Sequence, residues 1–163
     1  MLCFNYAFKE RRMTLFKSLV VAMVLALSPI TSFANNQQEQ SEALFFSAHV
    51  GHMPSIVQAI NNGANVNYSN ANRETAMHAA ASRGHLHVIQ YLRAKGGNMN
   101  ARTVQNWIPL HHAVRFGHAH VANYLLASGA PLLFRTSTGQ SVFDIAESTG
   151  DIRMLNLLMR YRR

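Results

Sequence analysis

The stretch Ile108-Pro-Leu-His111-His-Ala113-Val-Arg-Phe-Gly117-His118 decides the fold of this chain, because its pattern recurs at a fixed step. The same Gly-His pair stands 33 residues earlier, and again 33 residues before that. A period of this length predicts a repeat protein, in which each copy is a small structural unit that packs on its neighbours. The positions that keep the period are Gly51, Gly84, Gly117 and Gly150, the histidines of the pairs, His52, His85 and His118, and the inner histidines His78 and His111.

The period, together with the Ile-Pro-Leu-His and Gly-His elements in register, resembles the ankyrin repeat. The resemblance covers about residues 42–163 and implies an all-α solenoid of about four units, at 42–70, 71–103, 104–136 and 137–163. Each unit would have two short helices joined by a glycine turn and then an extended, β-hairpin-like finger. The resemblance also implies structural roles for the repeated residues. The inner histidines His78 and His111 tie the first helix to neighbouring backbone, and His52, His85 and His118 do so at the turns formed by Gly51, Gly84, Gly117 and Gly150.

The second unit illustrates why such a sequence forms paired helices. Thr75 precedes an alanine-rich segment, and a threonine hydroxyl at this place can accept a hydrogen bond from an orphan amide. Gly84 permits the turn that follows. The segment 86–94 then has leucine and isoleucine at helical spacing, which predicts one buried side. On the same pattern we expect buried side chains in the third unit at Leu110, Ala113, Val121, Leu125 and Leu126.

Residues 1–34 have the pattern of a bacterial export signal. A positive segment precedes the apolar run 19–27, and Ser32-Phe33-Ala34 offers the small residues that a signal peptidase reads. The run is shorter than the ~20 residues of a membrane span. We therefore expect cleavage after Ala34, no stable membrane insertion afterwards, and a periplasmic or secreted chain. An uncleaved anchor is the alternative, and Met13 is an alternative start. The polar segment 35–41 is expected to be a disordered linker.

Charge and cysteine content restrict the classes of partner. Residues 1–34 hold four basic residues and one acidic residue, so their removal lowers the formal net charge from +8 to +5. The basic residues are scattered, apart from the C-terminal arginines, which favours an acidic partner over a nucleic-acid groove. The only cysteine, Cys3, precedes the cleavage site, so the mature chain has neither a disulfide nor a lipidated cysteine.

No catalytic constellation is visible, so we expect no enzyme and no cofactor. The carboxylates show no pairing, and neither a Gly-x-Ser-x-Gly elbow nor a phosphate-binding loop occurs. The pairs His85/His87 and His118/His120 raise the alternative of a histidine-based metal scavenger. However, residues two apart on a helix point in different directions, and a zinc site needs converging ligands. We therefore expect no metal. His112 is interpreted as a satisfied inner histidine or as a weak proton switch.

Binding residues are expected where the repeat is free to vary, on the fingers and the inner helix ends. According to the resemblance these positions form a concave face. The third unit has the only tryptophan of the chain there, with an arginine and a phenylalanine, and tryptophan and arginine often carry interface energy. The alternative is that this indole folds against its own finger. The partner-binding candidates are Trp107, Arg115, Phe116, Arg83, Glu74, Gln105 and Gln140.

Taken together, these patterns predict a non-catalytic, monomeric module for protein–protein interaction that is exported to the bacterial periplasm. It would hold a protein partner on its concave face. The alternatives are an inhibitor or immunity-like protein of an exported enzyme or toxin, and a secreted effector directed at a host.

Overall fold

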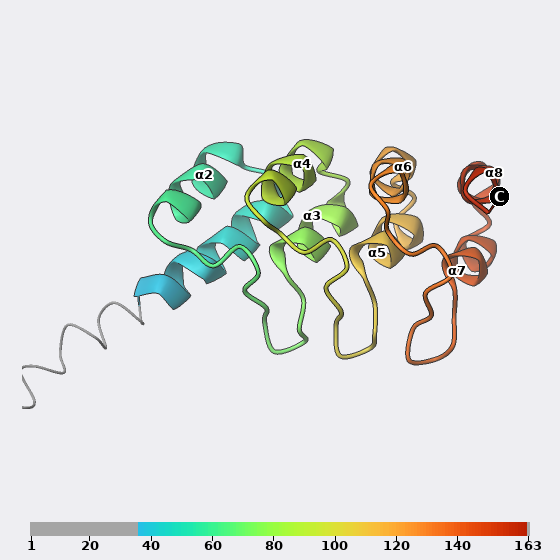
Figure 1. Ribbon diagram of the computed structural model, residues 1–163, viewed down its shortest axis with the longest axis horizontal. Coiled ribbons are helices and arrows are strands. Elements are labelled where there is room, and N and C mark those ends of the chain that lie inside the picture. The colour runs from blue at the N-terminus through green and yellow to red at the C-terminus, as the bar shows by residue number, and fades with distance from the viewer. Residues whose placement is uncertain (1–35, 163) are drawn as a thin grey trace, which may run out of the picture. The chain divides into compact units, whose positions relative to one another are not determined.

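Short helices follow one another in pairs along residues 36–162, the part of the chain that the computed structural model describes (Figure 1). The expected export signal and the alternative start at Met13 fall outside this range. The inner helices α3, α5 and α7 contact one another in a row, and so do the outer helices α4, α6 and α8. Helical residues 36–50 pair with α2 (Met53–Asn61), and the later pairs are α3 (Ala76–Arg83) with α4 (Leu86–Ala94), α5 (Pro109–Arg115) with α6 (Ala119–Ala127), and α7 (Val142–Thr149) with α8 (Ile152–Arg160).

The segment between one pair and the next is an extended finger, which projects beyond the inner helices (Figure 1). Among the described residues no strand forms, and the second unit's finger has a single antiparallel bridge between Ser69 and Thr75. Helical pairs with hairpin-like fingers are the architecture that the 33-residue period predicted. No helix within residues 36–162 combines the length and the apolar character needed to cross a bilayer.

The disordered linker expected over residues 35–41 is a wrong prediction, because residues 36–41 are helical and continue without a break to residue 50. Ser41 is 2% exposed, and its Oγ accepts a hydrogen bond from the Asn65 backbone N–H at 2.9 Å. Leu44, one turn later, is buried in the core. Glutamine and glutamate are good helix formers, so a few anchored side chains suffice to order a polar turn.

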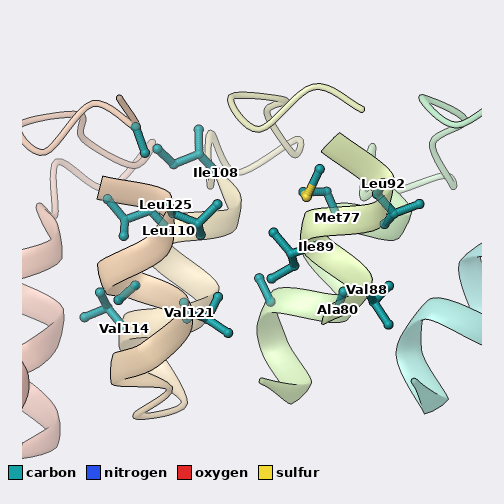
Figure 2. Close-up of a cluster of buried hydrophobic side chains, with 14 of the residues drawn as sticks. Met77, Ala80, Val88, Ile89, Leu92, Ile108, Leu110, Val114, Val121 and Leu125 are labelled. Carbon is teal, nitrogen blue, oxygen red and sulfur yellow. The ribbon is translucent and has the colours of Figure 1, made fainter. Parts of the chain in front are cut away.

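Apolar side chains from the inner and outer helices fill the space between successive pairs (Figure 2). The five residues expected to be buried in the third unit are all buried, and four of them have no exposed surface. Each such leucine contributes roughly 1.5–3 kcal/mol when it leaves water. Because a unit's apolar side faces the next unit, no pair completes its core alone. We call the apolar layer between two neighbouring units the seam. Its side chains include Met77, Ile89 and Leu92 of the second unit and Ile108, Leu110 and Leu125 of the third.

At two of the turns, the histidine ring of the following unit packs directly against the glycine. Gly84 ends α3 with a φ of 76°, and a Cβ at this position would lie 2.7 Å from Nδ1 of His118. Nε2 of His118 lies 3.1 Å from the Ser82 carbonyl oxygen, just before that turn. One unit earlier, His85 fits against Gly51 in the same way. Glycine is therefore required twice over at these turns, for the left-handed backbone and for the room that the imidazole takes.

The inner histidines connect the start of each inner helix to the next finger. Nδ1 of His78 accepts from the Thr75 backbone N–H at 3.1 Å, and its Nε2 lies 3.2 Å from the Trp107 carbonyl oxygen. His111 repeats both contacts, with Ile108 and with the carbonyl of Phe134. The Thr75 hydroxyl, expected to accept from a backbone amide, instead lies 2.9 Å from Nδ1 of His78.

In the fourth unit Asp144 takes the position of these histidines. It accepts from the Ser141 backbone N–H at 2.7 Å, so the contact at the helix start is kept. No further finger follows in the described chain, and a carboxylate, which only accepts hydrogen bonds, has no counterpart of the N–H donor that a histidine directs at the next finger. Hydrogen bonds from the backbone and hydroxyl of Ser141 lower the pKa of Asp144.

Candidate binding groove

Successive fingers are joined to one another by backbone hydrogen bonds. Val104 N–H donates to the Asn72 carbonyl at 3.0 Å, and Ser137 N–H donates to the Gln105 carbonyl at 2.9 Å. The Asn106 side chain adds a bond to the Arg135 carbonyl at 2.8 Å. The fingers therefore form a continuous wall beside the inner helices, and residues on both sides of the gap are held in fixed positions.

A hollow of ≈ 490 Å³ lies between this wall and the inner helices, where the second and third units meet. We call it the main hollow. It brings together five of the seven partner-binding candidates, although they come from two fingers and one helix end. Its lining consists of Asn72, Glu74, Ser82, Thr103, Val104, Gln105, Trp107, His112, Arg115 and Phe116.

Trp107 both packs on its own unit and lines the main hollow. Its ring centroid lies 5.8 Å from that of His111 and 5.3 Å from that of His112, the second contact being edge-to-face. The Arg115 guanidinium carbon lies 5.7 Å from the indole centroid. The indole is half-buried. Trp107 can therefore support its own unit and, at the same time, offer part of its ring to a partner.

The charged and apolar groups of the main hollow are left open to solvent or to a partner. Phe116 is 54% exposed and Val104 58%. Oε2 of Glu74 accepts from the Asn70 side-chain amide at 3.1 Å, and Oε1 has no hydrogen bond within the described chain. Arg115 is exposed and forms no salt bridge with any residue in 36–162. A carboxylate, a guanidinium and an apolar surface therefore face one space without neutralising one another.

A smaller hollow of ≈ 180 Å³ adjoins the main one on the side of the first unit. The two share Glu74, Ser82 and His112. It exists because Ala79, in the second unit, is much smaller than its counterpart His112 in the third. We call the two hollows together the groove. The additional lining residues of the smaller hollow are Phe45, His49, His78 and Ala79.

His112 is a half-buried histidine whose ring Nε2 is unsatisfied, which corrects the interpretation of a satisfied inner residue. Its Nε2 is buried and has no hydrogen-bond partner among the described residues. Its ring packs edge-to-face on His78, at 5.4 Å, as well as on Trp107. Burial lowers the pKa of His112 to about 3, and the charges of His78, His111 and Arg115 act in the same direction. The imidazole is therefore neutral at physiological pH.

Two of the partner-binding candidates lie outside both hollows. Arg83 donates from Nε to Nε2 of His49 at 3.0 Å, and its Nη2 lies 2.8 Å from the same atom. Since a guanidinium can only donate, Nε2 of His49 is the acceptor. Arg83 thus borders the smaller hollow through His49. Gln140 is exposed on the fourth unit's finger, where its backbone N–H donates to Oγ1 of Thr136 at 3.1 Å.

Sequence reasoning missed Phe45 and His49, since the first unit departs from the repeat pattern and gave no register for groove positions. A clue was present in the column of equivalent residues Phe46, Ala79, His112 and Ile145, where a small residue stands beside large ones. Such a change of size in one column marks a place where neighbouring units leave space.

The remaining histidine pairs contact backbone carbonyl groups at the preceding glycine turn. His85 and His87 both face the preceding turn: their Nε2 atoms lie 3.2 Å from the His49 carbonyl and 3.4 Å from the Gly51 carbonyl. The expectation that residues two apart point in different directions fails here, because His85 precedes the helix and is not part of it. Within residues 36–162 no three His, Cys, Asp or Glu side chains converge.

Comparison with known families supports this architecture. The family described as ankyrin repeats (3 copies) matches residues 16–103 and residues 44–136, which together cover more than half of the chain. A search of curated proteins gave no match. The stacked helical pairs, the linked fingers and this match together place the chain in the ankyrin-repeat family, whose members are generally modules for protein–protein interaction.

Proposed function

We propose that this chain is a non-catalytic binding protein, exported to the bacterial periplasm, that holds a protein partner in the groove. The observation that carries the proposal is the main hollow, which gathers the chain's only tryptophan, an exposed phenylalanine and an arginine that forms no salt bridge within residues 36–162. Tryptophan and arginine at the centre of an interface are the residue types that most often carry its binding energy.

The lining of the groove supports binding more than catalysis. Among the described residues that line the two hollows, Glu74 is the only carboxylate, so none of them pairs with it as acid and base. The Ser82 hydroxyl donates to the Ala79 carbonyl at 2.8 Å and is not held by a histidine, as an activated nucleophile would be. The groups that remain open are suited to hydrogen bonds, charge pairs and apolar contact.

Export is supported by the pattern of residues 1–34 alone. Expression of the full-length chain with a C-terminal tag in bacteria, followed by fractionation and N-terminal sequencing, tests it. We expect a periplasmic chain that begins at Asn35. A cytoplasmic chain with an intact N-terminus would refute this part of the proposal and leave the groove untouched.

Partner binding is tested by affinity capture from the native envelope with the tagged chain and a Trp107→Ala/Arg115→Ala variant. The identified partner should be recovered by the unaltered chain and lost by the double variant. Arg153→Ala is the matched control, because Arg153 is exposed on α8 and lines neither hollow. Equal recovery by all three chains would show that the partner binds elsewhere.

A further inference from the structure

We propose that the groove recognises a tyrosine side chain presented within an acidic segment of the partner. This inference rests on the proposed function and names the chemistry of its partner. Three features carry it: the apolar surface of the main hollow, the incompletely bonded carboxylate of Glu74, and two arginines, Arg115 in the main hollow and Arg83 beside the smaller one.

The apolar surface suits a flat ring. Trp107 is half-buried, and Val104 and Phe116 expose more than half of their surface on the same hollow. Aromatic rings gain about 0.5–1.5 kcal/mol from paired packing beyond the area that they bury. A partner ring placed here would cover exposed apolar surface that the fold itself leaves in water.

Glu74 requires a hydrogen-bond donor from the occupant. The residue is only partly exposed, and Oε1 has no hydrogen bond within the described chain, whereas Oε2 is bonded to Asn70. A phenol carries an O–H donor at the far end of an aromatic ring, and hydrogen bonds to an ionised acceptor are about twice as strong as neutral ones. Phenylalanine would desolvate the carboxylate without replacing its bonds to water, and tryptophan carries its N–H at the side of the ring.

A basic side chain would also satisfy Glu74, but the surrounding charges oppose it. The Arg115 guanidinium already lies over the Trp107 ring, where an incoming cation would have to bind. Arg83 adds a second positive charge beside the smaller hollow. A neutral hydrogen-bond donor therefore suits Glu74, and acidic residues on either side of that donor suit Arg115 and Arg83. Such charge pairs orient a partner and exclude a basic competitor.

The single tryptophan makes this inference directly measurable. Fluorescence of Trp107 in the full-length chain, excited where tyrosine does not absorb, is titrated with three end-blocked synthetic peptides: Glu-Glu-Tyr-Glu-Glu, the same peptide with phenylalanine at its centre, and the tyrosine peptide with lysines in place of glutamates. We expect saturable binding of the first, binding of the second weaker by ~10-fold or more, and no saturation with the third. Added salt should weaken the first complex.

Variants then assign each contact. Glu74→Ala should abolish the preference for tyrosine over phenylalanine, because the acceptor is removed. Arg115→Glu should weaken binding of the acidic tyrosine peptide by ~10-fold or more. Arg153→Glu, with the same change in charge on α8, should leave it unchanged. Thermal unfolding of each variant, followed by circular dichroism, shows that the chain is folded.

Several outcomes overturn the inference. Equal affinity for tyrosine and phenylalanine peptides would remove the role of Glu74, and stronger binding of the lysine peptide would reverse the charge assignment. If no peptide changes the fluorescence while capture of the partner still depends on Trp107, the chemistry proposed here is wrong and the binding function stands. Capture that is independent of Trp107 would instead show that the partner binds outside the groove, which refutes the proposed binding site.

Discussion

The second and third units stand next to each other in the stack and differ mainly on the side of the groove. In the seam between units they carry similar residues: Met77 corresponds to Leu110, Leu92 to Leu125, and His78 to His111. In and beside the groove the equivalent pairs differ in size, charge or polarity: Glu74 and Trp107, Ala79 and His112, Arg83 and Phe116.

The comparison shows how a repeat scaffold acquires a site. Seam residues must fit the same neighbour in every unit, and this requirement makes them alike. Groove residues border open space on one side, so each unit can differ there without loss of the stack. A hollow then arises where a unit with small groove residues, Ala79 and Ser82, meets one with large ones, Trp107 and Phe116.

The largest expected difference between seam and groove is in the unfolding free energy that is lost when a side chain is shortened. Leu125→Ala should lower the free energy of unfolding by about 2–5 kcal/mol, because it leaves a cavity between two units. Val104→Ala, in the groove, should change it by no more than ~0.5 kcal/mol, since the side chain is 58% exposed. Chemical denaturation of both variants measures the difference. Equal losses would mean that groove residues also hold the stack.

The second-largest expected effect is on the pH dependence of the unfolding free energy, to which the two units contribute differently. The third has His112 beside its inner histidine, where the second has Ala79. Burial lowers the pKa of His111 to about 4, that of His112 to about 3, and also that of His78, from the ordinary 6.5. Below pH 6.5 the unfolded chain binds protons that the folded chain does not, so the free energy of unfolding should fall as the pH decreases towards 4. Each such histidine contributes at most ~1.4 kcal/mol per pH unit.

His112→Ile, which places the residue of the fourth unit at this position, isolates the contribution of the groove. Its unfolding free energy, measured by urea denaturation between pH 7 and about 4, should depend less steeply on pH than that of the unaltered chain. An unchanged slope would show that His112 is protonated in the folded chain. His120→Ile, the same substitution at an exposed histidine that lines neither hollow, is the matched control.

The glycine turn within each unit predicts a smaller difference in unfolding free energy. Gly84 and Gly150 both have positive φ, of 76° and 68°, so alanine strains the backbone at either position. Only at Gly84 would the added Cβ meet His118, and at Gly150 nothing lies within 4 Å. Gly84→Ala should therefore lower the unfolding free energy by ~1 kcal/mol more than Gly150→Ala, the value of one lost hydrogen bond. In a His118→Ala background this excess should disappear; its persistence would exclude the clash as the cause.

The smallest effect on stability is expected for Phe116→Ala, within ~0.5 kcal/mol, because the ring is 54% exposed. The same change should weaken binding of the captured partner by about 2 kcal/mol or more if the ring is central to the interface. Arg83→Ala, outside both hollows, should weaken it less. Calorimetry of the purified complex compares the variants. The reverse order would move the interface towards the first unit.

Much of the scaffold could be predicted from the sequence because its period records a physical requirement. The repeated glycines mark the turns, and the segment predicted as the second helix of the second unit is α4, Leu86–Ala94. The buried set of the third unit was also correct. Five of the seven candidate binding residues line one hollow, because variable positions of a repeat fall on the same side in every unit.

Only the tertiary structure decided what these positions do together. His112 loses the hydrogen-bond partner of Nε2 because Trp107 and His78 surround it, and Arg83 is held by His49 from the preceding unit. The polar turn at residues 36–41 is helical because it packs on a segment more than twenty residues away. A period describes what every unit shares with its neighbours. The groove depends on differences between units, and a side chain's partner there is set by packing across the stack.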